Sequence, residues 1–271
     1  MSKIIIDANE KGIKLNLKEL YHYKDLFLIL AWRDLRVRYA QTFLGLFWAI
    51  LQPLATLVIF ILIFGRALKV DTGDIPYSVF ALAGMSAWSY FAFVLNQSGT
   101  SIISSQEMVK KVYFPRLVIP LSKAMTGFVD FSITLLFLFV MMIIYKVPIT
   151  KEIVYFPLFF ILNVMAALGA GIWTSALTIR YRDFQHVIPF VVQIGLYATP
   201  IAYPASLVPD KYQLLYHLNP MVGVVEGYRF SLLGINQMSD FSIISYVIIV
   251  LLFVSGLFYF RKVERVMADI V

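Results

Sequence analysis

The sequence predicts an all-α membrane protein with six transmembrane helices. Of its 271 residues, 60% are hydrophobic and 14% are charged, whereas a soluble domain carries about 25% charged residues. Six segments contain the roughly 20 apolar residues that a helix needs to cross the hydrocarbon layer. No Gly/Ser-rich or charge-rich linker interrupts the pattern. We therefore expect residues 1–271 to form a single membrane domain without a soluble appendage.

Charge and hydropathy divide this domain into three parts. Residues 1–42 read as a cytoplasmic segment, residues 43–260 as a six-helix bundle, and residues 261–271 as a cytoplasmic tail. The first 40 residues lack an apolar core followed by a small-residue cleavage site, so no removable signal peptide is expected. The predicted spans lie within Leu44–Phe64, Tyr77–Gln106, Leu117–Tyr145, Ile153–Ile179, Phe184–Pro209 and Phe241–Phe260.

The distribution of lysine and arginine predicts the orientation of the spans. Six spans place both termini on the same side of the membrane. If that side is the cytoplasm, 16 of the 23 basic residues flank the spans there and only 6 lie on the opposite side. Because basic residues flanking spans are retained in the cytoplasm, we expect both termini to be cytoplasmic.

An amphipathic helix precedes the first span. Apolar and aromatic residues recur at spacings of three, four and seven, which places them on one helix face. These residues are Leu17, Tyr21, Leu28, Trp32, Leu35 and Tyr39. The apolar patch is too short to span, and Arg33, Arg36 and Arg38 crowd the end of the helix. The segment is therefore expected to lie in the membrane interface, either as an anchor or in contact with a partner or anionic lipid.

The cytoplasmic stretch after the second span predicts a short helix. It reads SQEMVKKVYFPRLVIP and combines charged residues with exposed-looking aromatic residues, between prolines that constrain its shape. These features suit docking to another protein, although retention of basic residues in the cytoplasm explains the lysines equally well.

Two charged residues, Lys123 and Asp130, interrupt the third span. They are two helical turns apart, about 10 Å along the axis, so they do not pair directly. One interpretation is a proton relay or substrate contact. The simpler one, which we favour, is that Lys123 extends to the cytoplasmic interface while Asp130 contacts a neighbouring helix.

Aromatic residues make up 16% of the chain and gather inside or near the span ends. Most are expected to face lipid or the interfacial belts. A minority could line a conduit, where flat rings stack on sugar faces without fixing a moving chain. The candidates for such a lining are Trp48, Trp88, Tyr90 and Phe91.

The segment from Pro204 to Gly234, between the fifth and sixth predicted spans, is amphipathic, proline-bounded and too polar to cross the membrane. It is expected to dip back into the bilayer from the outer side. Glu226 and Arg229 are three residues apart, which favours a local ion pair over a substrate site.

Several functions lack their usual residues in this sequence. There is no cysteine, and three scattered histidines do not suggest a metal site. The basic residues are dispersed along loop edges, which argues against nucleic-acid binding. There is no GxxxxGK[ST] phosphate-binding loop for ATP hydrolysis, and Asp130 is the only acidic residue well inside a span. An intramembrane enzyme and a carrier with repeated halves are therefore disfavoured.

Several motifs resemble those of ABC-transporter permeases that export polysaccharides. They are RDLRVRYAQTFLGLFWAILQPL from Arg33, EMVKKVYFPRLVIPLS from Glu107, RYRDF from Arg180, TPIAYPASLVP from Thr199 and LNPMVGVVEGYR ending at Arg229. Together they cover most of the chain in the family's order. The most similar members are permeases of O-antigen and capsule export, with a further similarity to teichoic acid permeases.

The resemblance implies a homodimer in the inner membrane, joined to two copies of a separate ATP-binding subunit that carries ATP and magnesium. This chain would hold no cofactor and would not be an enzyme. The cargo would be an undecaprenyl-linked polysaccharide, as in lipopolysaccharide or capsule synthesis, moved through a channel at the dimer interface.

The resemblance also suggests roles for individual residues. ATPase coupling maps to the loop after the second span, at Glu107, Lys110, Lys111, Tyr113, Phe114 and Arg116. The outer gate maps to the paired re-entrant helices, with Tyr203, Glu226 and Arg229 as candidates. We further hypothesise that Arg33, Arg36 and Arg38 hold the lipid pyrophosphate at the cytoplasmic entrance.

Three alternative functions stay open at this point. One is an ABC permease for teichoic acid, a drug or a lipid. Another is a lipid-modifying intramembrane enzyme, which would turn over without an ATPase. The third is a proton-coupled carrier, in which Asp130→Asn would abolish transport, whereas an ABC permease predicts a mild effect.

Overall fold

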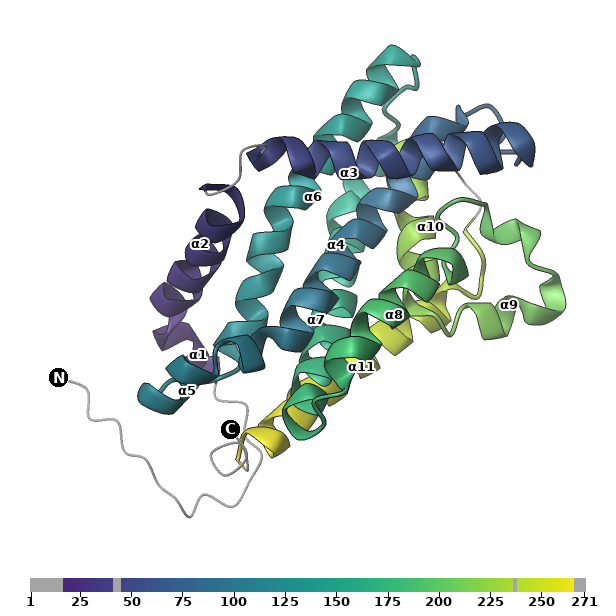
Figure 1. The fold of residues 1–271 in the computed structure, drawn as a ribbon. Helices are drawn as coiled ribbons and strands as arrows, with labels where there is room; N and C mark the ends of the chain where they lie inside the picture. The colour runs from purple at the N-terminus through teal and green to yellow at the C-terminus, as the bar shows by residue number, and fades with distance from the viewer. Residues whose placement is uncertain (1–16, 41–44, 236–237, 266–271) are drawn as a thin grey trace.

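The computed structural model describes residues 17–40, 45–235 and 238–265, and every regular element in these ranges is a helix (Figure 1). The segment that the sequence predicts to be an amphipathic helix forms α1 (Leu17–His22) and α2 (Lys24–Ala40), which are separated by a turn at Tyr23. The remaining elements are α3 (Gly45–Phe60), η1 (Ile61–Ala67), α4 (Tyr77–Ser104), α5 (Gln106–Lys111), α6 (Val118–Ile144), η2 (Lys151–Tyr155), α7 (Phe156–Arg180), α8 (Phe184–Ala198), η3 (Ala205–Leu207), α9 (Asp210–Tyr216), α10 (Pro220–Leu233) and α11 (Ser242–Glu264).

Five described helical segments are long and apolar enough to cross a membrane: Phe47–Ala67, Tyr77–Ser104, Val118–Ile144, Lys151–Arg180 and Ser242–Glu264. They correspond to five of the six predicted spans. The fifth predicted span contains only the 15-residue helix α8, which ends at Ala198. Thr199 and Pro200 follow, and because the residue before a proline disfavours helical geometry, the helix ends there.

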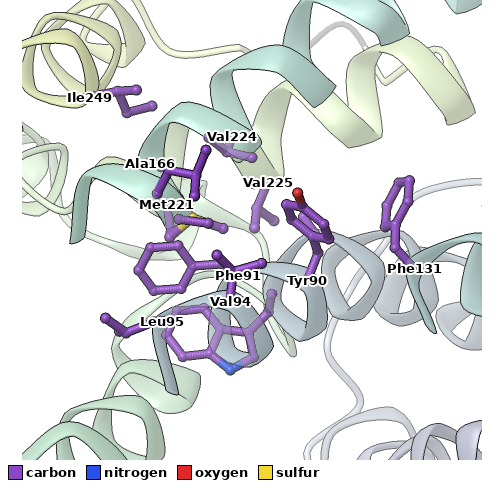
Figure 2. Close-up of a cluster of buried hydrophobic side chains, with 14 of the residues drawn as sticks. Tyr90, Phe91, Val94, Leu95, Phe131, Ala166, Met221, Val224, Val225 and Ile249 are labelled. Carbon is purple, nitrogen blue, oxygen red and sulfur yellow. The ribbon is translucent and has the colours of Figure 1, made fainter. Parts of the chain in front are cut away.

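Helix α4 is the centre of the bundle. In its most apolar 18-residue stretch, 83% of the residues are buried, against 11–33% in the other four spans. It packs against α6, α7 and α10. Small residues such as Ala83, Gly84 and Gly99 allow these helices to approach closely. Figure 2 shows the core beside α4, where Val94 and Leu95 lie among side chains of α7, α10 and α11.

Helices α7 and α11 are in direct backbone contact at Gly169. A Cβ atom at this position would lie 2.9 Å from both the Cα and the backbone nitrogen of Phe253. The glycine at position 256 of α11 likewise approaches the carbonyl oxygen of Gly169. Without a hydrophobic driving force between helices in lipid, such close van der Waals contact is what holds two spans together.

Substituting Gly169→Ala is therefore expected to destabilise the bundle. The added methyl group meets backbone rather than a flexible side chain, so the helices must separate, at a cost of about 1–3 kcal/mol. Thermal unfolding of the purified protein in detergent measures the effect. Val254→Leu adds a methylene on an exposed position of α11 and should leave the melting temperature unchanged. An unchanged melting temperature for Gly169→Ala would show that the two helices do not touch here.

Helix α10 is short but almost wholly buried. Its 14 residues pack against α4, α7 and α11. The Asn219 side chain accepts a hydrogen bond from the Met221 backbone N–H at its start, and Gly234 ends it in the left-handed conformation, with φ of 68°. With α9 it forms the segment that the sequence indicates is too polar to cross.

The described ends of the chain lie at one end of the bundle. Helix α1, helix α5 and the last turn of α11 are close to one another in Figure 1. The Arg116 backbone N–H, just after α5, donates a hydrogen bond of 2.9 Å to the Glu264 carboxylate of α11. We call this end of the molecule the α5 end.

Candidate functional site

A cavity of about 370 Å³ opens between α3 and α8, with α4 and α6 behind it and the end of α2 at one side. Its volume is in the range of small-molecule sites. The residues that line it are Arg38, Ala49, Gln52, Pro53, Thr56, Met85, Trp88, Ser89, Ala92, Phe93, Asn96, Gln97, Asp130, Thr134, Val192 and Leu196.

Several polar side chains line the cavity. It presents the amide side chains of Gln52, Asn96 and Gln97 together with an ion pair between Arg38 and Asp130. Such groups are costly at bilayer depth and usually mark a pathway for substrate or ions. Amides donate and accept hydrogen bonds at once, so this lining can bind hydroxyl-rich molecules.

Two aromatic rings complete the lining. The Phe93 ring centroid lies 4.6 Å from the Arg38 guanidinium carbon, which is a cation–π distance. Trp88 also faces the cavity, 5.3 Å from the Phe91 ring, measured between ring centroids. Flat apolar surfaces beside hydrogen-bonding groups suit the two kinds of surface on a sugar ring.

The two charges inside the third span both pair with α2. Lys123 Nζ contacts the Asp34 carboxylate. Asp130 accepts a hydrogen bond from the Tyr39 hydroxyl and forms an ion pair of 2.7 Å with Arg38. The prediction that Asp130 contacts a neighbouring helix is confirmed. The prediction that Lys123 extends to the interface is wrong, because its side chain is only 9% exposed against α2.

The three arginines of α2 do not form one cluster. Arg33 pairs with Asp34 at 2.9 Å, while Arg36 is exposed. Arg38 lies at the level of Asp130, twelve residues or about 18 Å along α6 from its start. Arg38 therefore lies beside the middle of α6, paired with Asp130 at 2.7 Å.

The other predicted aromatic candidates lie elsewhere. Trp48 is 54% exposed on α3. Tyr90 and Phe91 are buried in the core (Figure 2). The Tyr90 hydroxyl donates a hydrogen bond of 3.2 Å to the Ala124 carbonyl oxygen. Of the four candidates, Trp88 alone lines the cavity in the part of the chain that the structure describes.

The outer-gate candidates converge around α10. Arg229 donates to the backbone carbonyl oxygens of Ile201 at 2.8 Å and Tyr203 at 3.4 Å, and its guanidinium lies over the Phe80 ring. Glu226 instead contacts Ser242. The expected ion pair between Glu226 and Arg229 is therefore absent among the described residues.

Glu226 belongs to a second buried contact on the same helix. Its Oε2 atom lies 3.3 Å from His217 Nε2 and accepts a hydrogen bond of 2.6 Å from the Ser242 hydroxyl. Both partners come from the segments that flank α10. These contacts fasten α10 to the end of α9 and to the start of α11.

At the α5 end, a groove of about 510 Å³ runs beside the predicted coupling loop. Lys110, Lys111, Tyr113 and Arg116 line it, and Glu107 forms an exposed ion pair of 3.2 Å with Lys111.

Phe114 differs from the other residues of this loop. The sequence suggested an exposed ring, but the side chain is 4% exposed and packs in the core. It therefore anchors the loop to the bundle, while Tyr113 stays exposed. Partial desolvation and the nearby Glu19 carboxylate raise the pKa of Tyr113, so this residue stays a neutral phenol.

Several residues of these sites escaped the sequence analysis. Gln52, Asn96 and Gln97 carry no charge, although amides inside predicted spans were a signal that could have been used. Asp34 and Glu264 look like ordinary charged residues near helix ends in the sequence. Only the fold brings Asp34 to Lys123 and Glu264 to Arg116. No group of three or more potential metal ligands occurs among the described residues.

Residues 25–233 match the family described as ABC-2 type transporter. The chain is 29% identical to an O-antigen export system permease protein of Klebsiella pneumoniae, over 95% of this chain and 98% of that protein. A second O-antigen export system permease protein, from Myxococcus xanthus, is 28% identical over 78% of this chain and 82% of its own length.

The similarity extends to a polysialic acid transport protein. The polysialic acid transport protein of Escherichia coli is 26% identical over 87% of this chain and 92% of that protein. The family match covers more than half of the chain, from α2 through α10. The chain therefore belongs to the ABC-2 type transporter family.

Proposed function

We propose that this chain is the transmembrane subunit of an ATP-driven exporter that moves lipid-linked polysaccharide, of the O-antigen or capsule type, across the inner membrane. The observation that carries the proposal is the polar cavity between α3 and α8, which combines amides, an ion pair and aromatic rings. The names of the relatives point to the same cargo class, since they are described as O-antigen and polysialic acid exporters.

The proposed assembly is a homodimer whose shared interface closes the cavity. The cavity opens between α3 and α8, which expose apolar residues such as Val58, Ile59, Val191 and Ile194. Lipid against the opening would leave Gln52 and the ion pair of Arg38 facing hydrocarbon, which is costly. A second copy seated on these two helices removes that cost and makes the two cavities one conduit.

The proposed topology has six crossings with both termini in the cytoplasm. The described ends of the chain lie together at the α5 end, whereas five crossings alone would separate them. Helix α8 and the segment after it are the remaining candidate for a crossing. In this arrangement α9 and α10 form the re-entrant outer segment, and α2 runs from the cytoplasmic interface into the bundle.

The proposed coupling element is α5 and the loop after it, which would contact a separate ATP-binding subunit. Glu107, Lys110 and Lys111 are exposed there, and the groove beside them is polar. Phe114 fixes the loop to the core, so a push on α5 would reach α6 directly. Pro53 in α3 and Pro189 in α8 are positions at which the spans beside the cavity can bend.

Co-expression with an ATP-binding subunit of the family tests this proposal. We expect a purified complex with two copies of each chain, which hydrolyses ATP and delivers polysaccharide to the outer face of the membrane. Mass measurement of the complex, ATP hydrolysis and surface polysaccharide are the three readouts.

Loss of surface polysaccharide in cells that lack this chain, with recovery on re-expression, would connect the complex to the cargo. Transport or turnover by the purified chain without any ATPase would contradict the proposal and favour a carrier or an enzyme. A complex with a single copy of the chain would contradict the shared conduit.

A further inference from the structure

Two ion pairs join α2 to α6, and they differ in their surroundings. The pair of Asp34 and Lys123 lies outside the cavity and is 18% and 9% exposed. The pair of Arg38 and Asp130 lines the cavity and is 39% and 21% exposed. The first pair is therefore enclosed by protein, while the second can be reached by a molecule in the cavity.

Arg38, the cation of the second pair, needs an anionic partner whether or not a ligand is bound. Arg38 lies about 18 Å along α6, near the middle of that span, where an unpaired charge is expensive. Its planar guanidinium matches the geometry of a carboxylate and equally that of a phosphate. Asp130 therefore presents to Arg38 the same chemistry that an anionic ligand would present.

We infer that the cavity binds an anionic oxygen group of the cargo at Arg38, and that Asp130 is the internal counter-ion which this group replaces. The inference rests on the proposed function. When the ligand arrives, Arg38 exchanges one anionic partner for another. The free-energy cost of bringing the ligand's anionic group into the bilayer interior is therefore lower. Asp130 keeps the Tyr39 hydroxyl as a hydrogen-bond donor after the exchange.

The rest of the lining indicates what accompanies the anion. The amides of Gln52, Asn96 and Gln97 suit sugar hydroxyl groups, and Trp88 supplies a flat apolar surface. A phosphate next to a sugar fits both features. An acidic sugar carboxylate carries the same anionic chemistry and is the second possible source.

The test uses the purified complex with its ATP-binding partner in nanodiscs, with binding followed by native mass spectrometry. The probes are undecaprenyl diphosphate, undecaprenol and a sialic acid oligomer. We expect Asp130→Asn to lower the dissociation constant for undecaprenyl diphosphate at least about tenfold, because the ligand no longer competes with a carboxylate. Arg38→Gln should raise it by a similar factor, to the value for undecaprenol.

Four further variants control for the loss of charge. Asp25→Asn and Lys24→Gln remove charges at exposed positions of α2 and should bind as the wild type does. Asp130→Glu keeps the negative charge of the counter-ion, so the gain in affinity expected for Asp130→Asn should be absent. Arg38→Lys keeps the charge but loses the planar pair of donors, and intermediate affinity is expected.

The outcomes separate the inference from the function beneath it. A gain in Asp130→Asn for the sialic acid oligomer alone would support the counter-ion exchange and assign the anion to the sugar. Equal affinity of the wild type, Asp130→Asn and Arg38→Gln for every anionic probe would overturn the inference and leave the proposed function standing. Absence of binding in all variants would overturn both.

Discussion

Replacing Asp34 with leucine is expected to lower the free energy of unfolding by about 3–5 kcal/mol, because it leaves Lys123 charged and unpaired in a buried position. Lys123 is 9% exposed and forms an ion pair with Asp34. The reverse substitution, Lys123→Met, should cost much less, since Asp34 retains Arg33 at 2.9 Å. We therefore expect a larger loss of stability for Asp34→Leu than for Lys123→Met.

The double substitution Asp34→Leu/Lys123→Met completes the cycle. It removes both charges and places apolar groups between α2 and α6, so most of the lost stability should return. Thermal unfolding of the purified protein, followed by fluorescence and by size-exclusion chromatography, gives all four values. If Asp34→Leu melts at the wild-type temperature, α2 does not lie against α6 as described.

Replacing Glu264 with alanine is expected to uncouple ATP hydrolysis from export. Glu264 holds the loop after α5 through two contacts with Arg116. Its carboxylate accepts a hydrogen bond from the Arg116 backbone N–H at 2.9 Å, and its backbone carbonyl oxygen accepts one from the Arg116 guanidinium at 2.9 Å. Within α11, the same carboxylate pairs with Arg261 at 2.8 Å. The loop is thereby connected to the end of α11, so motion of α5 is passed to a second span.

Without this carboxylate, the loop keeps only the contact between the Arg116 guanidinium and the backbone carbonyl oxygen of residue 264, so motion of α5 is passed to α11 less directly. Export of polysaccharide should fall at least about tenfold, which corresponds to a coupling free energy within the usual 1–3 kcal/mol, while ATP hydrolysis by the complex changes less than about twofold. The matched control is Glu152→Ala, which removes a partly exposed glutamate of η2, the short helix before α7. A parallel loss of hydrolysis and export would show that Glu264 supports folding or assembly instead.

Most of the helical architecture could be predicted from the sequence. The five long spans, the short helix after the second span and the helix before the first all occur where hydropathy and charge predicted them. A membrane span is a local property, since a continuous apolar run satisfies its own backbone hydrogen bonds wherever it packs. The one span that was overestimated, α8, is shortened by a proline whose effect is also local.

The candidate sites were less predictable. Arg38, Trp88 and Asp130 were each singled out, but nothing in their spacing indicated that they share one cavity. Two predictions about charged side chains were wrong. Lys123 pairs with Asp34 rather than reaching the interface, and Arg229 binds backbone carbonyl oxygens rather than Glu226.

The sequence by itself determined that this protein is a helical membrane protein, which segments can span, and which motifs it shares with polysaccharide-exporting permeases. Only the tertiary structure decided which charges face each other and which polar residues line one cavity. The physical reason is the range of the interactions. Burial of an apolar segment depends on its own composition, whereas an ion pair such as Arg38 with Asp130 joins residues that are distant in the chain and depends on how two helices pack.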